Sequence, residues 1–220
     1  NSRSWDAQSG ELDGQPDLPV GVKLTYLLNG KEMSAEEIAG KEKNPWRQAR
    51  LIYNYMLDTY TLSSASQKKR TSPLELLSKK KGDAYDFAVI YTTLVRACGI
   101  PALPIGGVLV DADLKATPHW WTELYLENFG WVPVDVALGA GLSYKAFRPI
   151  HDARLFYFGN LDSQHVAFSR GWNEVKPSFV NSKTVYRERT YALQSIWEES
   201  SADVESYSSY WIVPAVLGIY

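Results

Sequence analysis

The most regular run of apolar positions in the chain predicts one long buried helix that begins at Ala84 and reaches Cys98. Apolar residues recur at helical spacing along this run, and most residues between them are also apolar or small. A helix that is apolar on more than one side packs against several neighbours. Asp83 is a good N-cap, Asp86 occupies the capping-box position, and the glycine and proline that follow Cys98 end the helix. We therefore expect the fold to be arranged around this helix.

The residues before the central helix predict a mostly helical N-terminal half. Ser34 opens a capping box for a short helix that reaches about Ala39. Asn44 and Pro45 open a longer helix that ends near Thr59. The other predicted elements are an extended or poorly ordered lead-in at 1–18, a short strand at 20–26, a surface loop at 61–72 and a short helix at 73–77.

After the central helix the pattern changes to strands. Residues 119–127 alternate between two faces, and a short turn at 128–130 leads into a return strand that contains Asp135. An antiparallel hairpin would bring Asp135 beside His119, with a β-bulge to adjust the register. The remaining predictions are strands at 105–110, 155–158, 165–169 and 185–193, a turn at 111–115, a loop with a short helical turn at 137–153, and a final strand or packed segment at 210–220.

Together these elements predict an α+β fold in which the central buried helix packs on an antiparallel β-sheet. The 220 residues can bury a substantial core, and we expect a single domain over residues 19–220. The net charge is −2 and no basic patch occurs, so nothing favours nucleic acid as a partner. Cys98 is the only cysteine, which excludes an internal disulfide. No stretch approaches the roughly 20 apolar residues of a membrane span.

The chemistry of the chain is concentrated in three segments. The start of the central helix offers free N–H groups and a partial positive charge, which would lower the pKa of a thiol and stabilise an oxyanion. The second segment is Pro118-His119-Trp120-Trp121-Thr122-Glu123, and the third is Gly130-Trp131-Val132-Pro133-Val134-Asp135. Their order along the chain is helix start, histidine, aspartate.

These segments resemble the core of the transglutaminase-like superfamily, a branch of the papain-like cysteine hydrolases and acyltransferases. That family has Gly-Asp-Cys-x-Asp at the helix start, His-x-Trp-x-Glu on a strand and Gly-Trp-x-x-x-Asp on the next strand. The resemblance covers residues 45–140, and residues 157–162 resemble a later segment of bacterial members. It implies a cysteine peptidase or acyltransferase whose Cys-His-Asp triad acts on amide groups of proteins or peptides. The sequence has no glycine-rich phosphate loop and no Cys/His metal spacing, so we expect no cofactor or metal.

One position departs from the family pattern. The nucleophilic cysteine of the family falls on Ala84, whereas His119 and Asp135 match the other two members of the triad. Cys98 cannot replace the missing thiol, because it lies 14 residues along the same helix. At 1.5 Å per residue that is about 21 Å away, at the helix end that disfavours a thiolate. We expect the chain as given to lack thiol-dependent turnover, as a natural pseudoenzyme or as a Cys→Ala variant of an active enzyme.

The resemblance implies further roles around this position. The backbone N–H of Ala84 would be one oxyanion donor, and Trp46 and Gln48 are weak candidates for the second. Candidates for substrate contact are Tyr85, Trp120 and Trp121. Water as the second nucleophile gives a peptidase or deamidase, and a lysine amine gives a transglutaminase. The order of the segments does not choose between these reactions.

Different classes of function stay open beside this one. The 8 Trp and 14 Tyr also fit a non-catalytic peptide- or glycan-binding module, although aromatic residues are more often core. The chain could also be a structural domain of a larger protein. A cleft at Ala84 and His119 that is open to an extended chain would favour binding or catalysis. A filled cleft and an unpaired His119 would favour a structural domain.

The remaining polar candidates are expected to be structural. His151 and His165 have no partner motif. Asp111, Asp113 and Asp152 are expected to serve turns, because no twelve-residue acidic loop ending in Glu is present that would bind calcium. The chain begins with Asn1 rather than Met, which favours a processed part of a longer product and weakly favours an exported bacterial protein.

Overall fold

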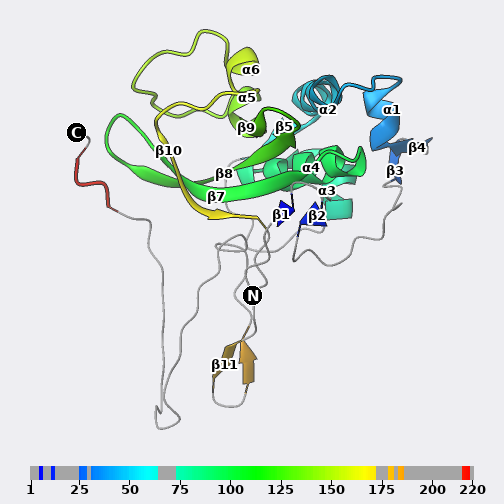
Figure 1. Cartoon of the computed structure of the whole chain (residues 1–220). Helices are drawn as coiled ribbons and strands as arrows, with labels where there is room; N and C mark the ends of the chain where they lie inside the picture. Colours follow the sequence, from blue (N-terminus) through cyan, green and yellow to red (C-terminus); the bar gives the residue numbers. More distant parts are fainter. Residues whose placement is uncertain are drawn as a thin grey trace.

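Helices and one four-stranded sheet make up most of the part of the chain that the computed structural model describes (Figure 1). That part comprises residues 5–6, 11–12, 25–28, 31–63, 73–171, 178–180, 183–185 and 215–218. The two long helices are α2 (Pro45–Thr59) and α4 (Ala84–Ala97). The short helices are α1 (Ala35–Ala39), α3 (Pro73–Lys79), α5 (Val136–Gly139) and α6 (Ala153–Phe156).

Local side chains fix the ends of the long helices as the sequence predicts. At the start of α2 the Asn44 side chain accepts a hydrogen bond from the N–H of Arg47, and Pro45 occupies the first turn. At the start of α4 Asp83 and Asp86 form the predicted capping box. After α4 the chain turns at Gly99, whose φ of 78° lies in the left-handed region that glycine adopts without strain.

The sheet has the strand order β10 (His165–Arg170), β7 (Ala102–Val110), β8 (Ala116–Leu126) and β9 (Gly130–Val134). All three neighbouring pairs are antiparallel. The short two-stranded pairs are β1 (Trp5–Asp6) with β2 (Glu11–Leu12), β3 (Thr25–Leu28) with β4 (Lys31–Ser34), β5 (Thr61–Leu62) with β6 (Lys81–Gly82), and β11 (Ser178–Val180) with β12 (Lys183–Val185).

Helix α4 packs against one face of this sheet and forms the centre of the main core. The Thr122 hydroxyl of β8 donates to the carbonyl of Ala88 at 3.2 Å and lies 3.0 Å from the hydroxyl of Thr92, so this face of β8 meets α4. Helices α2 and α5 lie beside α4 (Figure 1). The buried side chains of α4 include Phe87, Ile90, Tyr91, Leu94 and Val95. The predicted α+β fold, a central buried helix on an antiparallel sheet, is confirmed.

Two predicted features of the C-terminal half are wrong. Residues 155–158 do not form a strand, because the Asp152 side chain accepts the N–H of Leu155 at 2.8 Å and caps α6 instead. Phe158 makes only an isolated bridge to Val134. The hairpin of β8 and β9 needs no bulge, since its register runs evenly from Leu126 opposite Gly130. A register shift occurs instead where β10 pairs with β7.

Other predictions reach beyond the described residues. Most of the lead-in, residues 13–24, 64–72 and most of the strand predicted at 185–193 lie outside them. Of the predicted final strand, residues 215–218 form neither helix nor strand, and residues 210–214 and 219–220 lie outside the described part. The single-domain boundary at 19–220 stays a prediction. Within the described part, no helix has the length and apolar character needed to cross a membrane.

Candidate active site

The turn into α4 is built by close contacts among the residues of the first motif. The Asp83 carboxylate accepts the N–H of Asp86, and the Asp86 carboxylate accepts the N–H of Asp83, each at 3.1 Å. A Cβ at Gly82 would lie 2.5 Å from the Cβ of Asp86, so only glycine allows this approach. Strand β6, which directly precedes this turn, is held by its pairing with β5. Ala84, the candidate nucleophile position, is therefore the first residue of a firmly capped helix.

His119 and Asp135 form a buried pair on the hairpin that follows. His119 Nε2 lies 2.5 Å from Asp135 Oδ2, and both side chains are almost completely buried. Strand β9 ends opposite Thr122, so Asp135 follows directly and lies on the side of β8 to which His119 points. Asp135 Oδ1 also accepts the N–H of Leu138 at 2.8 Å, which makes Asp135 the N-cap of α5. The hairpin thus brings the two together, as the sequence predicts.

The tautomer of His119 follows from this contact. Asp135 Oδ2 accepts a hydrogen bond, so Nε2 carries the proton and the neutral ring has its lone pair at Nδ1. Within the described residues, Nδ1 makes no hydrogen bond. Nδ1 is therefore the atom of His119 that is left to accept a proton.

The contact between helix start and strand runs through the neighbours of the two candidate residues. Tyr85 and Trp120 are both half-buried, and their rings meet edge to face with centroids 5.5 Å apart. Side chains alternate along a strand, so Trp120 faces α4 whereas His119 faces Asp135. Among the described residues, no hydrogen bond or ring contact joins Ala84 to His119 directly. Ala84 and His119 are thus each followed in the chain by one of the two residues, Tyr85 and Trp120, that contact each other.

The other candidates of the sequence analysis lie in different surroundings. Trp121 is 3% exposed and stacks against His119 with ring centroids 6.3 Å apart, so it supports the histidine from within the core. The Gln48 side-chain amide donates to the carbonyl of Glu42 at 2.8 Å. The Trp46 ring packs on Phe158, with centroids 4.2 Å apart.

A second histidine joins the pair, and the expectation that His165 has no partner is wrong. His165 Nε2 lies 3.1 Å from Asp135 Oδ2, and His165 Nδ1 lies 2.9 Å from Asp162 Oδ1. The His165 side chain is 3% exposed. Its ring lies 5.7 Å from that of His119 and 5.1 Å from that of Trp121, centroid to centroid. No periodicity in the sequence signalled this contact; only the family-like segment at 157–162 lies nearby.

The opposite charges of His165 and the two aspartates stabilise one another. Burial acts to lower the pKa of His165, but the hydrogen bonds to Asp135 and Asp162 outweigh it and raise that pKa to about 9. Burial acts to raise the pKa of Asp135 and of Asp162. For Asp135 the contacts with His119 and His165 outweigh burial, and for Asp162 the hydrogen bonds with His165, Tyr144 and Tyr157 do so, which holds both pKa values well below the ordinary range. At neutral pH the cluster therefore contains two carboxylates and an imidazolium at His165.

Two imidazoles and a carboxylate are also a ligand set that could hold a metal ion. One ligand atom each from His119, Asp135 and His165 lie within 4.8 Å of one another. The two histidine–aspartate distances, 2.5 and 3.1 Å, are hydrogen-bond distances. Ligands of a tetrahedral zinc ion with bonds of 2.0–2.1 Å are about 3.3 Å apart. These distances therefore fit hydrogen bonds between the groups better than they fit the coordination of a metal ion.

The acidic residues that could suggest calcium have local partners, and Asp111 serves a turn as predicted. Asp111 Oδ1 accepts the N–H groups of Asp113 and Lys115, each at 2.9 Å. Asp113 pairs with Lys145 on the surface. Asp152 caps α6. Each carboxylate is thus accounted for by local backbone or ion-pair geometry.

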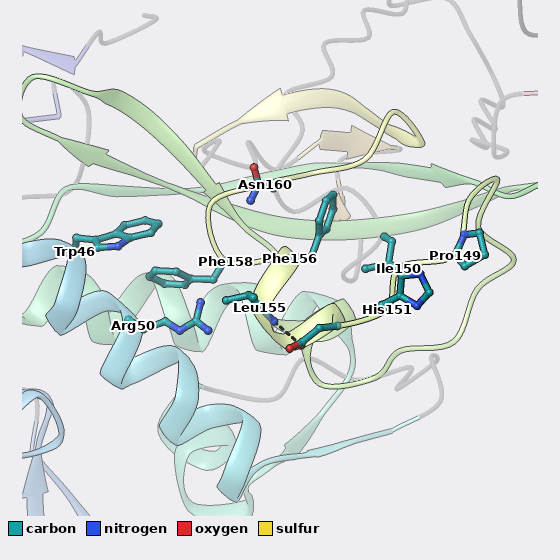
Figure 2. A pocket seen from close by; sticks show the side chains of 10 residues that line it. Trp46, Arg50, Pro149, Ile150, His151, Leu155, Phe156, Phe158 and Asn160 are labelled. Carbon is teal, nitrogen blue, oxygen red and sulfur yellow. Dashed lines mark hydrogen bonds between the residues drawn. The ribbon is translucent and has the colours of Figure 1, made fainter.

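A groove of about 680 Å³ lies between α2 and residues 149–160 (Figure 2). Its walls include Trp46 and Arg50 from α2 and Phe158 from the facing segment, and the Arg50 guanidinium lies 4.7 Å from the centre of the Phe158 ring. Ala84 and His119 do not line this groove. His119 itself is 1% exposed. The groove is therefore a feature apart from the helix start.

The sequence comparison agrees with this arrangement of segments. Residues 32–136 match the family model of the transglutaminase-like superfamily. Over these residues the chain is similar to a transglutaminase-like core. The matched stretch includes Ala84, His119 and Asp135, and it ends one residue after Asp135. His165 and Asp162 lie beyond this core.

The proteins that are similar to this chain match it over only part of their own length. An uncharacterized protein of Haemophilus influenzae is 26% identical over 163 residues, which is 61% of this chain and 44% of that protein. A candidate cysteine protease from Cytophaga hutchinsonii is 19% identical with a TM-score of 0.41, covering 68% of this chain and 54% of the other. The periplasmic domain of TgpA from Pseudomonas aeruginosa is 19% identical with a TM-score of 0.41, covering 46% and 40%. The chain thus spans about half the length of these relatives.

The charged His165 predicts that the folded chain loses stability as the pH rises. Below pH 6.5 the histidine is protonated in both the folded and the unfolded chain, and its contribution is fully present. Between pH 6.5 and about 9 the unfolded chain releases the proton first, so the free energy of unfolding falls. A pKa difference of this size corresponds to about 3 kcal/mol.

Urea denaturation at pH 6.0 and pH 9.5 measures this loss. We expect His165→Gln to remove most of the pH dependence, whereas His151→Gln, which changes an exposed histidine, should retain it. A parallel decline in wild type and His165→Gln would contradict a charged His165.

Proposed function

We propose that this domain has the scaffold of a thiol-dependent peptidase or acyltransferase that acts on protein or peptide amides, and that it lacks its nucleophile. The observation that carries the proposal is the buried contact of 2.5 Å between His119 and Asp135. Both residues occupy positions of the motifs that the superfamily places on neighbouring strands. Ala84 occupies the corresponding position at the start of α4. The chain as given would therefore have no thiol-dependent turnover.

A thiol-bearing counterpart would carry out the chemistry of a Cys-His-Asp triad. A thiol at position 84 would transfer its proton to His119 Nδ1, and the sulfur would attack the amide carbonyl carbon. The tetrahedral oxyanion would be stabilised by free N–H groups at the start of α4. His119 would return the proton to the leaving amine as the C–N bond breaks, which leaves a thioester. Water would then give an acid, or a lysine amine a new amide. Asp135 would orient the imidazole throughout.

Substrate contact in this proposal falls to Tyr85 and Trp120. Both rings are half-buried and lie next to the two candidate positions. Trp121 is buried behind His119 and would act as support. The partner class is a protein or peptide chain that presents an amide. An exported location stays a prediction.

The pairing of His119 also bears on the alternatives. A purely structural domain would be expected to leave His119 without a partner, whereas its Nε2 is bonded to Asp135. A scaffold that retains the histidine and the aspartate of the triad fits the proposal best.

The test is to restore the thiol and look for acyl transfer. Ala84→Cys is incubated with benzyloxycarbonyl-glutaminylglycine and hydroxylamine, with casein as a protein substrate, and hydroxamate, ammonia and new peptide ends are measured. We expect product from Ala84→Cys and none from the wild-type chain or from Ala84→Cys/His119→Asn. A folded Ala84→Cys variant that forms no product from either substrate and no thioester by mass spectrometry would contradict the proposal.

A further inference from the structure

The ring of His165 lies between two carboxylates, and this fixes its charge. Nε2 faces Asp135 Oδ2 at 3.1 Å, and Nδ1 faces Asp162 Oδ1 at 2.9 Å. Ionised carboxylates only accept hydrogen bonds, so both nitrogens must carry protons. His165 is then an imidazolium. Its raised pKa of about 9 agrees with this assignment.

Asp135 therefore serves two histidines at once. Its Oδ2 accepts from His119 at 2.5 Å and from His165 at 3.1 Å, and its Oδ1 accepts the N–H of Leu138. The charge of His165 lies close to the His119 ring, with centroids 5.7 Å apart. A second positive charge on His119 is disfavoured at this distance, because both rings are buried and solvent screens them little. The aspartate gives His119 less support than an unshared carboxylate would.

The surrounding elements hold His165 in this position. Tyr144 and Tyr157 both donate their hydroxyl groups to Asp162 Oδ2, and the N–H of Gln164 donates to Asp162 Oδ1. The Tyr157 ring lies 6.1 Å from the His165 ring. Strand β10 approaches β7 closely at Gly107, where a Cβ would lie 2.0 Å from the carbonyl oxygen of Val166. The cluster is thus fixed by two strands and a loop.

We propose that His165, oriented by Asp162, is a positioning residue that shares Asp135 and places a positive charge behind His119, so that the site activates a thiol at position 84 less than a His119–Asp135 pair alone would. This inference rests on the proposed function. It adds that the chain departs from an active thiol site in two places, the missing nucleophile and the shared aspartate. Restoring the cysteine alone therefore restores only part of the activation.

The chemistry affected is the proton transfer that forms the nucleophile. The thiol S–H bond breaks, the proton moves to His119 Nδ1, and the products are a thiolate and an imidazolium. The imidazolium at His165 opposes the new charge on His119. Asp135 contacts both rings, and Asp162 contacts the His165 ring. Tyr144 and Tyr157 stay protonated, because burial and their hydrogen bonds to Asp162 raise their pKa values.

The first measurement is the charge of His165 in the unaltered protein. The chain has only three histidines, so long-range ¹H–¹⁵N spectra can follow each imidazole against pH. We expect His165 to titrate near pH 9 and to fall by about one pH unit or more in Asp162→Asn, which removes one of its two acids. A titration of His165 near 6.5 in the wild-type chain would overturn the proposal.

The second measurement compares thiol reactivity in Ala84→Cys and Ala84→Cys/His165→Gln. Glutamine can still donate to Asp135, but it carries no charge. We expect the pH at half-maximal iodoacetamide labelling to be about one to two units lower in the double variant. Ala84→Cys/His151→Gln is the matched control and should label like the single variant. If His165→Gln prevents folding, Ala84→Cys/Asp162→Asn should shift labelling in the same direction by a smaller amount.

The outcomes separate this inference from the proposed function. Equal labelling of the single and double variants, at a pH below that of a free thiol, would overturn the role of His165 and leave the proposed function standing. Labelling of both variants no faster than a free thiol would overturn the proposed function, and the positioning role with it. The titration of His165 would then still decide its charge.

Discussion

Ala84→Cys is expected to create a thiol that iodoacetamide alkylates well below pH 8, about tenfold faster at pH 6 than a free thiol. A free thiol with a pKa near 8.5 is less than about 1% ionised at pH 6. The free N–H groups at the start of α4 and a proton acceptor at His119 Nδ1 would make most of the new thiol ionised at that pH. The gain is partly offset because a thiolate of lower pKa is a weaker nucleophile.

The chain provides its own control for this experiment. The wild-type protein contains Cys98 alone, and this half-buried residue at the far end of α4 reports background labelling. Ala84→Cys/His119→Asn should lose the labelling below pH 8, because asparagine cannot take the proton. If both variants label at the same pH, the helix start alone lowers the pKa of the thiol. If neither labels faster than a free thiol, His119 Nδ1 does not face position 84.

Asp135→Asn is expected to lower the free energy of unfolding by about 3–5 kcal/mol at pH 7. The change removes the negative charge from between two buried histidines, and a buried charge that loses its partner is strongly destabilising. Asparagine retains the capping contact to the N–H of Leu138, so the effect isolates the charge. Asp135→Ala should cost about 1 kcal/mol more, because it also removes the cap.

Urea denaturation monitored by tryptophan fluorescence measures this effect. Asp113→Asn is the matched control, since Asp113 pairs with Lys145 on the surface with a side chain 65% exposed, and it should unfold like the wild type. Asp135→Asn/His165→Gln should regain part of the lost stability, because the unpaired imidazolium is gone. Equal stability of Asp135→Asn and wild type would mean that the cluster is not ionised as described.

The parts of the fold that the sequence predicted are those set by nearby residues. Asp83, Asp86 and Gly99 lie within a few residues of the helix ends that they fix, so the bounds of α4 could be predicted closely. The same holds for Asn44 and Pro45 at the start of α2. Local capping also explains the error at 155–158. Asp152 caps a helix there, and a short apolar run reads equally well as a strand.

The hairpin of β8 and β9 could be predicted for the same reason. Its two strands are joined by a turn of three residues, so their pairing is decided locally, and the motif positions put His119 and Asp135 on it. The strand alternation gave the correct faces. Only the expected bulge was wrong, because Asp135 reaches His119 diagonally rather than from directly opposite.

The sequence by itself thus determined the α+β class, the ends of the long helices, the absence of a thiol at position 84 and the pairing of His119 with Asp135. Only the tertiary structure brought His165 to Asp135, 30 residues away along the chain, through the pairing of β10 with β7. The physical reason is the range of the interactions. Caps and hairpins are fixed by neighbouring residues, whereas the charge of a buried cluster depends on which distant strands pair and which groups they enclose.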